Sequence, residues 1–400
     1  MLDYLLLTLI GCLIGVITGL TPGLHVNTVT LIGLSMFPVL GLTPLQFAAI
    51  MIAVSITQNF LDFIPAIFVG VPEERTALSI LPTHKLLLQG KALEAVKLTA
   101  YGSLLGVAFS LLLLVPALFI IPIIYESIRG FVVWVVLIAV LFLILREKTQ
   151  EKIMWSVAVF LLSGYFGLTI FKLKIVSSTQ VLFPAFAGLF GLSTIIFSLK
   201  EKTTKIPQDR FAPFQFDRKL LFSGFLGSLG GVIVGVLPSM SPSQIGIIMS
   251  EIFGGSVRNF LVSLSAINTS DAIYSLVSLY TINNPRSGVA TMLGKIITIN
   301  FSTLMLFTGV IAFSAAIATF LHLKTGKLAI AFVDKINYRL LCMASLVLVL
   351  FLIYVFNGIF GILLSMLAMS IGMLPILTGT SRTHAMGILV VPTVFYFLGL

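Results

Sequence analysis

Charged residues are scarce in this chain of 400 residues, and cysteine and histidine are scarcer still. Asp, Glu, Lys and Arg make up 10% of the sequence, whereas a soluble domain has about 25%. The two cysteines and four histidines form no disulfide framework and no metal-ligand spacing. These absences exclude a soluble domain, a disordered chain and a disulfide-rich secreted scaffold.

Apolar residues fill the sequence instead, at 58% of the chain and a mean hydropathy of +1.14. Because a spanning helix needs about 20 mainly apolar residues, we expect an all-α polytopic membrane protein. Fourteen apolar segments are present, the second and ninth being weak as complete spans: 2–20, 24–41, 46–70, 98–121, 131–146, 153–171, 180–199, 219–237, 240–254, 258–282, 289–321, 340–357, 359–378 and 384–400.

The basic residues predict the orientation of these spans. If the linker around 200–219 is cytoplasmic, 19 of the 24 lysines and arginines fall on the cytoplasmic side. This bias is typical of membrane topology, which accounts for the net charge of +10 without a nucleic-acid partner. It predicts a multi-pass protein of the cell membrane with both termini outside.

Two stretches of the chain resemble each other. Residues 15–22 match residues 231–238 at five of eight positions, with an offset of 216, and both matches end in proline. An Asn-x-x-Asp pair then recurs, at Asn59 and Asp62 and at Asn268 and Asp271, with an offset of 209. We therefore expect two inverted-topology repeats, each a broken helical hairpin followed by about five spans: 1–200 and 219–400, joined by the cytoplasmic linker 201–218. Such repeats are typical of secondary transporters, although a duplication retained only for packing is the alternative.

Both hairpins are interrupted by proline and carry polar residues where each helix restarts. Free N–H groups at a helix start favour an anion, so two such starts predict a substrate site for a carboxylate or phosphate. The alternative is that the hydroxyls only satisfy loosened backbone. The candidate substrate residues are Pro22, Gly23, Leu24, His25, Asn27 and Thr28 in the first half, and Pro238, Ser239, Ser241, Ser243 and Gln244 in the second.

Asp62 and Asp271 lie inside apolar segments, where a charge costs about 2.5–3.5 kcal/mol on insertion scales and therefore indicates function. Spacing i, i+3 places Asn59 beside Asp62 and Asn268 beside Asp271. Such oxygens suit Na⁺, and a buried carboxylate can instead carry H⁺. We expect an ion-coupling site at these four residues, with a carboxylate that caps freed backbone near Pro65 as the alternative.

The remaining candidates are weaker. His25 could bind substrate or accept a proton, whereas His84, His322 and His384 stand near segment ends and are interpreted as interfacial. Arg382 lies in a polar turn that could close a gate or bind an anion, although an arginine that sets topology is the commoner case. Protease, hydrolase and ATPase motifs are absent, so we expect no enzyme and no cofactor beyond coupling Na⁺ or H⁺.

Several motifs resemble a known family, the large permease subunit of tripartite tricarboxylate transporters. They are Gly15-x-x-x-Gly19-x-x-Pro22-Gly23-Leu24, Asn59-x-x-Asp62, Gly70-Val71-Pro72, Gln89-Gly90-Lys91-Ala92-x-x-Ala95 with Gly102-Ser103, and Arg382-Thr383-His384-Ala385-Met386-Gly387 with Pro392. The chain is shorter than the usual large subunit and is most similar to a compact, archaeal-type branch. The resemblance implies carboxylate uptake driven by Na⁺ or H⁺, assisted by a small membrane subunit and an extracytoplasmic binding protein, with Pro22-Gly23 and Pro238 at the substrate-binding breaks.

Together these observations predict an ion-coupled secondary transporter for a small organic anion, a di- or tricarboxylate, that works by alternating access and possesses two inverted halves. A translocase (flippase) of a lipid-linked phosphate is the alternative, since the same electropositive pocket suits a phosphate headgroup. An intramembrane enzyme is a third reading, which needs a nucleophile and base that the sequence does not show. A homo-oligomer stays open.

Overall fold

The computed structural model is helical throughout the residues that it describes, and no strand occurs among them. The described residues are 2–21, 26, 29–30, 33–34, 37–68, 83, 86–87, 89–172, 178–200, 207–211, 217–237, 240–253, 256–333 and 338–399. The helices of the first half are α1 (Leu2–Leu20), α3 (Pro44–Leu61), α4 (Phe63–Phe68), α6 (Ala92–Leu112), α7 (Leu114–Ile128), α8 (Val132–Leu145), α9 (Gln150–Lys172), α10 (Ser178–Phe186), the π-helical turn η2 (Ala187–Leu192) and α11 (Ser193–Lys200). Those of the second half are α12 (Arg218–Val236), α13 (Pro242–Phe253), α14 (Val257–Ile282), α15 (Gly288–Ile296), α16 (Phe301–Val333), α17 (Tyr338–Thr378) and α18 (Gly387–Leu398), with short 3₁₀ turns η1 (Phe37–Val39) and η3 (Arg382–Met386).

Eight helices of the described chain are long and apolar enough to cross a membrane, or nine if α7 and α8, bent by 89° at their junction, form one broken span. The prediction of an all-α polytopic membrane protein is therefore confirmed. Two further apolar helices, Val181–Phe197 and Arg382–Leu398, are shorter. α13 has 12 residues, about 18 Å of helix, so it is too short to span a bilayer core of about 30 Å on its own.

The structure corrects two predicted segments. The segment 98–121 divides at Leu113, where α6 ends and α7 begins. The segment 289–321 divides at Ile297, whose extended backbone (φ −148°, ψ 139°) ends α15 four residues before α16 begins. The segments 340–357 and 359–378 join into α17, but Gly358 between them has a positive φ of 61° and interrupts the helix.

Glycines let α1 and α12 pack closely against their neighbours. Gly11, Gly15 and Gly19 of α1 lie against Ile50, Thr57 and Gln58 of α3, and a Cβ on Gly11 would come within 2.5 Å of the Ile50 carbonyl oxygen. Gly227, Gly231 and Gly235 of α12 lie in the same way against Ser263, Ser270 and Tyr274 of α14. Residue numbers rise together in both pairs, so α1 runs parallel to α3 and α12 runs parallel to α14.

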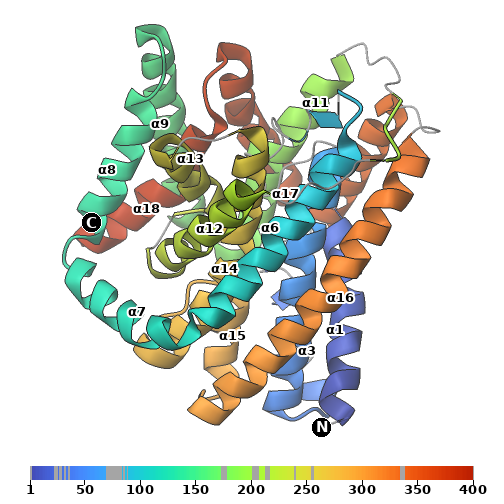
Figure 1. The fold of residues 1–400 in the computed structure, drawn as a ribbon. Helices are drawn as coiled ribbons and strands as arrows, with labels where there is room; N and C mark the ends of the chain where they lie inside the picture. Colours follow the sequence, from blue (N-terminus) through green and yellow to red (C-terminus); the bar gives the residue numbers. More distant parts are fainter. Residues whose placement is uncertain are drawn as a thin grey trace.

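The two pairs run in opposite directions. α6 is parallel to α14, since Gly102 meets Val262 and Gly106 meets Ala266. α1 begins at the end of the bundle where α6 finishes, as Figure 1 shows. α16 is antiparallel to α6, because Val96 meets Gly326 whereas Thr99, further along α6, meets His322. The described helices of this bundle thus form two sets, α1, α3 and α16 in one direction and α6, α12 and α14 in the other.

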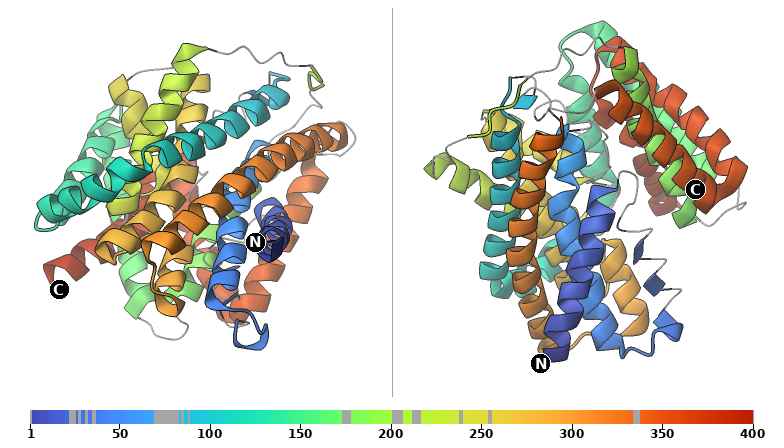
Figure 2. Two further views of the ribbon diagram at one scale, coloured as in Figure 1. Left: turned by 60° about the horizontal axis from the view of Figure 1, so that its bottom comes forward. Right: turned by 90° about the vertical axis from the view of Figure 1, so that its right-hand side faces the viewer.

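A second group of helices stands beside this bundle. α17 packs on α9, α10, η2 and α11, and α18 packs on α8 and α9, as the red and green ribbons of Figure 2 show. An apolar cluster connects the two groups through α8, α12, α13 and α18; its members include Val136, Val234, Ile245 and Val390. Each group contains helices from both halves of the chain.

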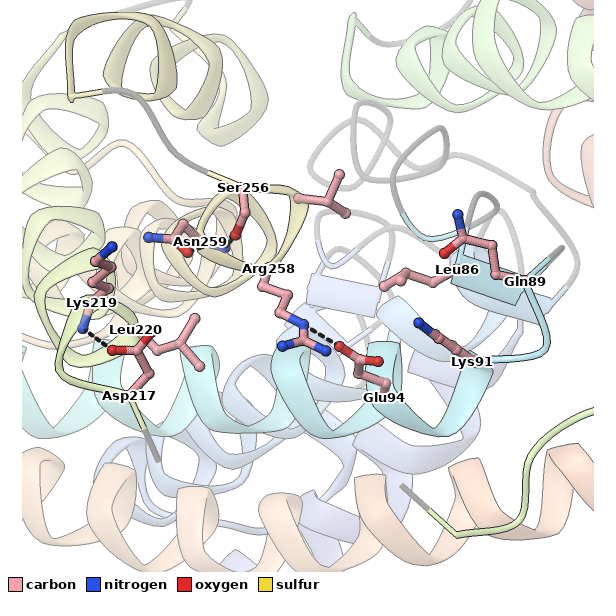
Figure 3. Close-up of a pocket in the computed structure, with 11 residues that line it drawn as sticks. Leu86, Gln89, Lys91, Glu94, Asp217, Lys219, Leu220, Ser256, Arg258 and Asn259 are labelled. Atoms are coloured by element: carbon pink, nitrogen blue, oxygen red, sulfur yellow. Dashed lines mark hydrogen bonds and ion pairs between the residues drawn. The ribbon is translucent and has the colours of Figure 1, made fainter. Parts of the chain in front are cut away.

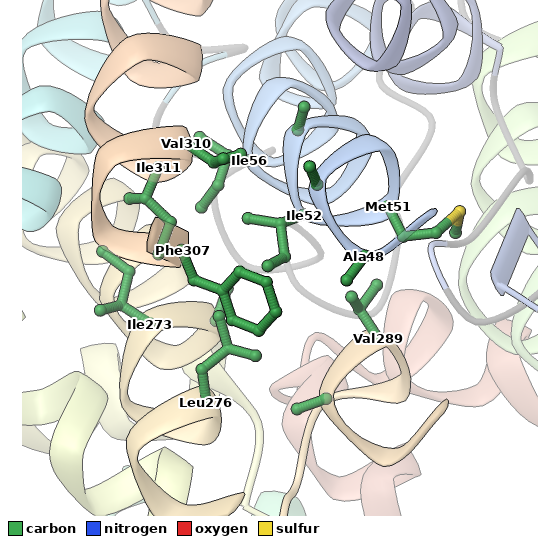
Figure 4. Close-up of a cluster of buried hydrophobic side chains, with 14 of the residues drawn as sticks. Ala48, Met51, Ile52, Ile56, Ile273, Leu276, Val289, Phe307, Val310 and Ile311 are labelled. Atoms are coloured by element: carbon green, nitrogen blue, oxygen red, sulfur yellow. The ribbon is translucent and has the colours of Figure 1, made fainter. Parts of the chain in front are cut away.

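α3 and α14 lie at the centre of the first bundle. The apolar window of α3 with α4 is entirely buried and that of α14 nearly so, whereas most of α17 faces outward. Phe307 and Ile311 of α16 and Val289 of α15 cover α3 and the C-terminal half of α14 (Figure 4). Enclosure on all sides keeps α3 and α14 from lipid, so their polar residues must find partners inside the protein.

Candidate functional site

The last two turns of α3 carry a run of polar residues that is out of contact with solvent and lipid. Thr57, Gln58 and Asn59 are each fully buried, and Asp62, which ends the helix, is 3% exposed. In the capping position the Asp62 N–H donates to the carbonyl oxygen of Gln58 at 2.9 Å. The amphipathic pattern typical of a surface helix is missing here because every face of α3 meets another helix.

The middle of α14 carries the corresponding run. Asn268, Thr269 and Ser270 are fully buried, and Asp271 is 4% exposed. The hydroxyls of Thr269 and Ser270 donate to carbonyl oxygens in the preceding turn of their own helix, as hydroxyls in membrane helices often do. The Thr269 hydroxyl also lies 3.1 Å from the carbonyl oxygen of Ser103 on α6, and the amide of Asn268 points to α3.

Asn59 and Asn268 join the two helices through reciprocal hydrogen bonds. The Asn59 Nδ2 donates to the carbonyl oxygen of Asn268 at 3.2 Å, and the Asn268 Nδ2 donates to the carbonyl oxygen of Asn59 at 3.3 Å. Both side-chain Oδ1 atoms are buried without a hydrogen-bond partner among the described residues. The sequence predicted both residues as site members, and the structure places them in direct contact.

Unpaired amide oxygens deep in a protein are costly unless a ligand uses them. Amide and carboxylate oxygens are the donors that hard cations prefer, and Asp62 and Asp271 each lie three residues beyond one of the asparagines. No group of three or more His, Cys, Asp or Glu side chains that could hold a metal ion occurs in the described chain. Amide oxygens beside a buried carboxyl group can contribute to an alkali-cation site, and a buried carboxyl group can carry a proton.

His322 is a residue of this region whose role sequence reasoning missed. The interpretation of His322 as interfacial is wrong, because the residue lies within α16 and its side chain is fully buried in the protein. Its Nδ1 lies 2.6 Å from the carbonyl oxygen of Phe60, the residue after Asn59. The predicted apolar segment ended at 321 because Lys324 and Lys327 follow, yet α16 continues to Val333.

The two predicted breaks are described only in part. Pro22, Gly23, Leu24, His25, Asn27 and Thr28, like Pro238 and Ser239, lie outside the described residues. In the second half, Ser241 and Gln244 form a capping box at the start of α13: the Ser241 N–H donates to the Gln244 Oε1 at 2.9 Å, and the Gln244 N–H donates to the Ser241 Oγ at 3.3 Å. Ser243 is fully buried. This geometry matches the alternative in which these side chains satisfy backbone groups.

A polar pocket of about 630 Å³ opens where α6, α12 and α14 begin (Figure 3). Two of its charged side chains form an ion pair, Arg258 with Glu94, and Asp217 caps α12 by accepting from the main-chain N–H of Lys219. Three segments that the charge bias places on one side of the membrane thus meet at one end of the bundle. The pocket is separate from the Asn59–Asn268 contact.

The polar turn at Arg382 is part of the second helix group. Arg382 donates to the Thr194 hydroxyl, and burial lowers the pKa of its guanidinium to about 10. The Glu147 Oε1 accepts from the Ser381 N–H at 2.8 Å and lies 3.1 Å from the His384 Nε2. His384 is therefore buried too and not interfacial, whereas His84 lies outside the described residues.

Comparison with known proteins decides the family. The model of the tripartite tricarboxylate transporter TctA family matches residues 5–387. The chain belongs to this family. The resemblance found in the motifs is thereby confirmed, and so is the assignment to a transporter family of the membrane. An uncharacterized protein of Methanocaldococcus jannaschii is 33% identical over 404 residues, which cover 98% of this chain and 99% of that protein. No solved structure matches this TctA-family chain.

Proposed function

We propose that this chain is an ion-coupled secondary transporter for a small organic anion, a di- or tricarboxylate, and that it works by alternating access. The observation that carries the proposal is the reciprocal pair Asn59–Asn268, buried where two enclosed helices from opposite halves of the chain meet. Transporters place ion and substrate sites at such a repeat interface near the middle of the membrane. Membership of the TctA family supports the same class of function.

The helix directions support an inverted repeat. α1 and α3 correspond to α12 and α14 through their glycine contacts, and α6 corresponds to α16 as the next long helix. α1 and α3 run opposite to α12 and α14, and α6 runs opposite to α16. A rotation of 180° about an axis in the membrane plane, passing near the asparagine pair, produces this reversal. The proposed halves are 1–200 and 219–400, each with a broken hairpin.

The proposed sites follow from this symmetry. Coupling Na⁺ or H⁺ binds at Asn59, Asp62, Asn268 and Asp271, and the anion binds at the breaks around Pro22 and Pro238. Transport then rocks one helix group against the other about the apolar cluster that connects them.

The charge bias supports an orientation with the pocket of Figure 3 in the cytoplasm and both termini outside the cell membrane. α1 begins at the opposite end of the bundle from this pocket, which agrees with an external N-terminus. By analogy with the family name, a small membrane subunit and an extracytoplasmic binding protein are the proposed partners.

Uptake into proteoliposomes tests the proposal. Labelled citrate and a panel of di- and tricarboxylates are offered under an imposed Na⁺ or H⁺ gradient to the wild type, Asp62→Asn and Asp271→Asn. Asp3→Asn is the matched control, since Asp3 is an exposed carboxylate at the start of α1. We expect gradient-driven uptake by the wild type and the control, and at least a tenfold loss in both site variants.

Uptake that ignores both gradients, or that survives in both site variants, contradicts the coupling site. Absence of uptake for every carboxylate, with and without an added binding protein, contradicts the substrate class. A polyprenyl-phosphate flipping assay on the same vesicles then tests the translocase of a lipid-linked phosphate.

A further inference from the structure

His322 connects three helices beside the proposed ion site. Its ring lies between the end of α3 and the second turn of α6, with Nδ1 2.6 Å from the Phe60 carbonyl oxygen. The Nε2 lies 3.1 Å from the Val96 carbonyl oxygen and 3.1 Å from the Thr99 Oγ1. Both ring nitrogens therefore have oxygen partners although the side chain is fully buried.

The neutral ring has a single N–H, so by itself it can donate a hydrogen bond to only one of the two carbonyl oxygens beside it. A carbonyl oxygen can only accept, so Nδ1 carries a hydrogen and donates to Phe60. The Nε2 of the neutral ring then has a lone pair that faces the Val96 carbonyl oxygen. The Thr99 hydroxyl can supply a hydrogen-bond donor to this lone pair when it turns toward Nε2.

The doubly protonated ring is satisfied as well. Its Nε2–H donates to the Val96 carbonyl oxygen, and the Thr99 hydroxyl turns to donate to the Ala95 carbonyl oxygen, 3.0 Å from its Oγ1. Gain or loss of one proton thus needs only the rotation of one hydroxyl, with no buried group left unpaired. A histidine that served only to connect helices would need no such second arrangement.

We propose that His322 is a proton-binding residue of this transporter, and that its protonation state controls how firmly the last turn of α3 is held. The inference deepens the proposed function and rests on it. Hydrogen bonds from a charged donor are about twice as strong as neutral ones, so the imidazolium holds the Phe60 carbonyl more firmly. Pro65 has no N–H to donate to the carbonyl oxygen of Leu61, the residue after Phe60, so the end of α3 depends more on hydrogen bonds from side chains such as His322.

The position of Phe60 gives the proton a direct route to influence the site. Phe60 stands between Asn59, which contacts Asn268, and Asp62, which ends α3. Other charged and titratable groups lie on α16 and on the elements packed against it, and they form the electrostatic surroundings of the ring. They are Lys324 and Lys327 on α16, Glu94, Lys97 and Tyr101 on α6, Asp62 after α3, Asp3, Tyr4 and Cys12 on α1, and Arg258, Asp271, Tyr274 and Tyr280 on α14. The direct partners of the ring are main-chain oxygens and Thr99.

Nuclear magnetic resonance of the full chain, labelled with ¹⁵N-histidine in lipid nanodiscs, tests the proposal without any substrate. Only four histidines are present, and His322→Gln assigns the His322 signal. If that variant does not fold, the signal is assigned by elimination, with His25→Gln, His84→Gln and His384→Gln. We expect a reversible change from the neutral ring to the imidazolium within the pH range in which the protein stays folded.

Thr99→Val gives a result that a purely structural histidine would not show. The variant removes the donor to the neutral Nε2 but leaves the acceptor for the imidazolium. We therefore expect its titration midpoint to rise by about half to one pH unit, the equivalent of one hydrogen bond. His384→Gln, a change at a buried histidine of the other helix group, is the matched control and should leave the His322 signal unchanged. A His322 ring that stays neutral throughout the folded range, or a Thr99→Val midpoint that stays or falls, overturns the proposal.

Transport adds a second readout on the same variants. In proteoliposomes with the carboxylate panel, His322→Gln should lose uptake driven by a pH gradient but keep exchange of labelled for unlabelled substrate, which moves no net proton. If His322→Gln keeps both activities, the proposed role of His322 in coupling is overturned. If no carboxylate is transported by the wild type, the proposed function fails, while the titration of His322 is still decided by resonance.

Discussion

Gly227→Ala should loosen the contact between α12 and α14 at a cost that the structure allows us to estimate. The new Cβ would lie 2.4 Å from the Ser263 carbonyl oxygen and 2.7 Å from the Ala266 Cβ. Real Cβ contacts stay beyond about 3.0 Å, so the helices must separate by at least about 0.6 Å. Overpacking of this kind costs about 1–3 kcal/mol. The value to measure is the free energy of unfolding, by titration with a denaturing detergent.

Two further variants make this prediction specific. Gly11→Ala places its Cβ 2.5 Å from the Ile50 carbonyl oxygen in the other half, so it should cost the same amount. The two losses should add within about 0.5 kcal/mol, since the contacts share no residue. Gly309→Ala on α16 has nothing within 4 Å of its Cβ, and it should be neutral or stabilising because alanine favours a helix.

If Gly227→Ala and Gly11→Ala each cost less than about 0.5 kcal/mol, and so behave like Gly309→Ala, the close packing of α12 on α14 and of α1 on α3 is refuted. The assignment of helix directions would then lose its support, because it depends on the same contacts.

Three other predictions concern separate parts of the chain. Asn59→Ala and Asn268→Ala should each cost about 0.6–1.7 kcal/mol, the range for hydrogen bonds between membrane helices; a double-mutant cycle should show coupling above about 0.5 kcal/mol, and additive losses would deny the contact. Arg258→Ala should change the unfolding free energy by less than about 1 kcal/mol, because Arg258 is 54% exposed in its pair with Glu94; a larger loss in the same titration would show a buried role. Gly358→Ala should cost about 1–3 kcal/mol through its backbone alone, because φ 61° with ψ −158° is a conformation that essentially only glycine adopts and nothing lies within 4 Å of its Cβ; an unchanged midpoint of thermal unfolding would show that α17 straightens without strain.

Much of the fold could be predicted from composition and recurrence. Apolar segments gave most of the long helices, and the boundary at Gly358 coincides with the interruption of α17. The division of 289–321 was missed because Ile296, Ile297 and Ile299 keep the segment apolar while the backbone between α15 and α16 is extended. Hydropathy records which residues avoid water and carries no information on where a helix breaks.

The candidate site was predictable as a set of residues and not as a contact. Asn59 and Asn268 stand out as polar side chains in apolar segments, but their meeting depends on the docking of helices 209 residues apart. The register also differs from the sequence alignment. Gly11 meets Ala53 on α3, and Gly227 meets Ala266 on α14. The glycine contacts therefore align α3 with α14 at an offset of 213 residues, about one helical turn away from the offset of 209 between Asn59 and Asn268. His322 escaped prediction because its partners are two main-chain oxygens and the hydroxyl of Thr99, 223 residues away in the sequence, which no sequence pattern reveals.

The central position of α3 has a consequence for biosynthesis. α3 is made early, yet α14, α15 and α16, which cover it, are encoded in the second half of the chain. At roughly 5–20 residues per second, the 209 residues that separate Asn59 from Asn268 take roughly 10–40 s to synthesise. During that interval the ribosome-bound chain holds α3, with its polar last turns, in or near the membrane, and α1, α4 and α6 are its described neighbours from the first half. The insertion machinery must therefore shelter α3 until the second half arrives, and a stalled or truncated chain would present this helix to the quality-control proteases.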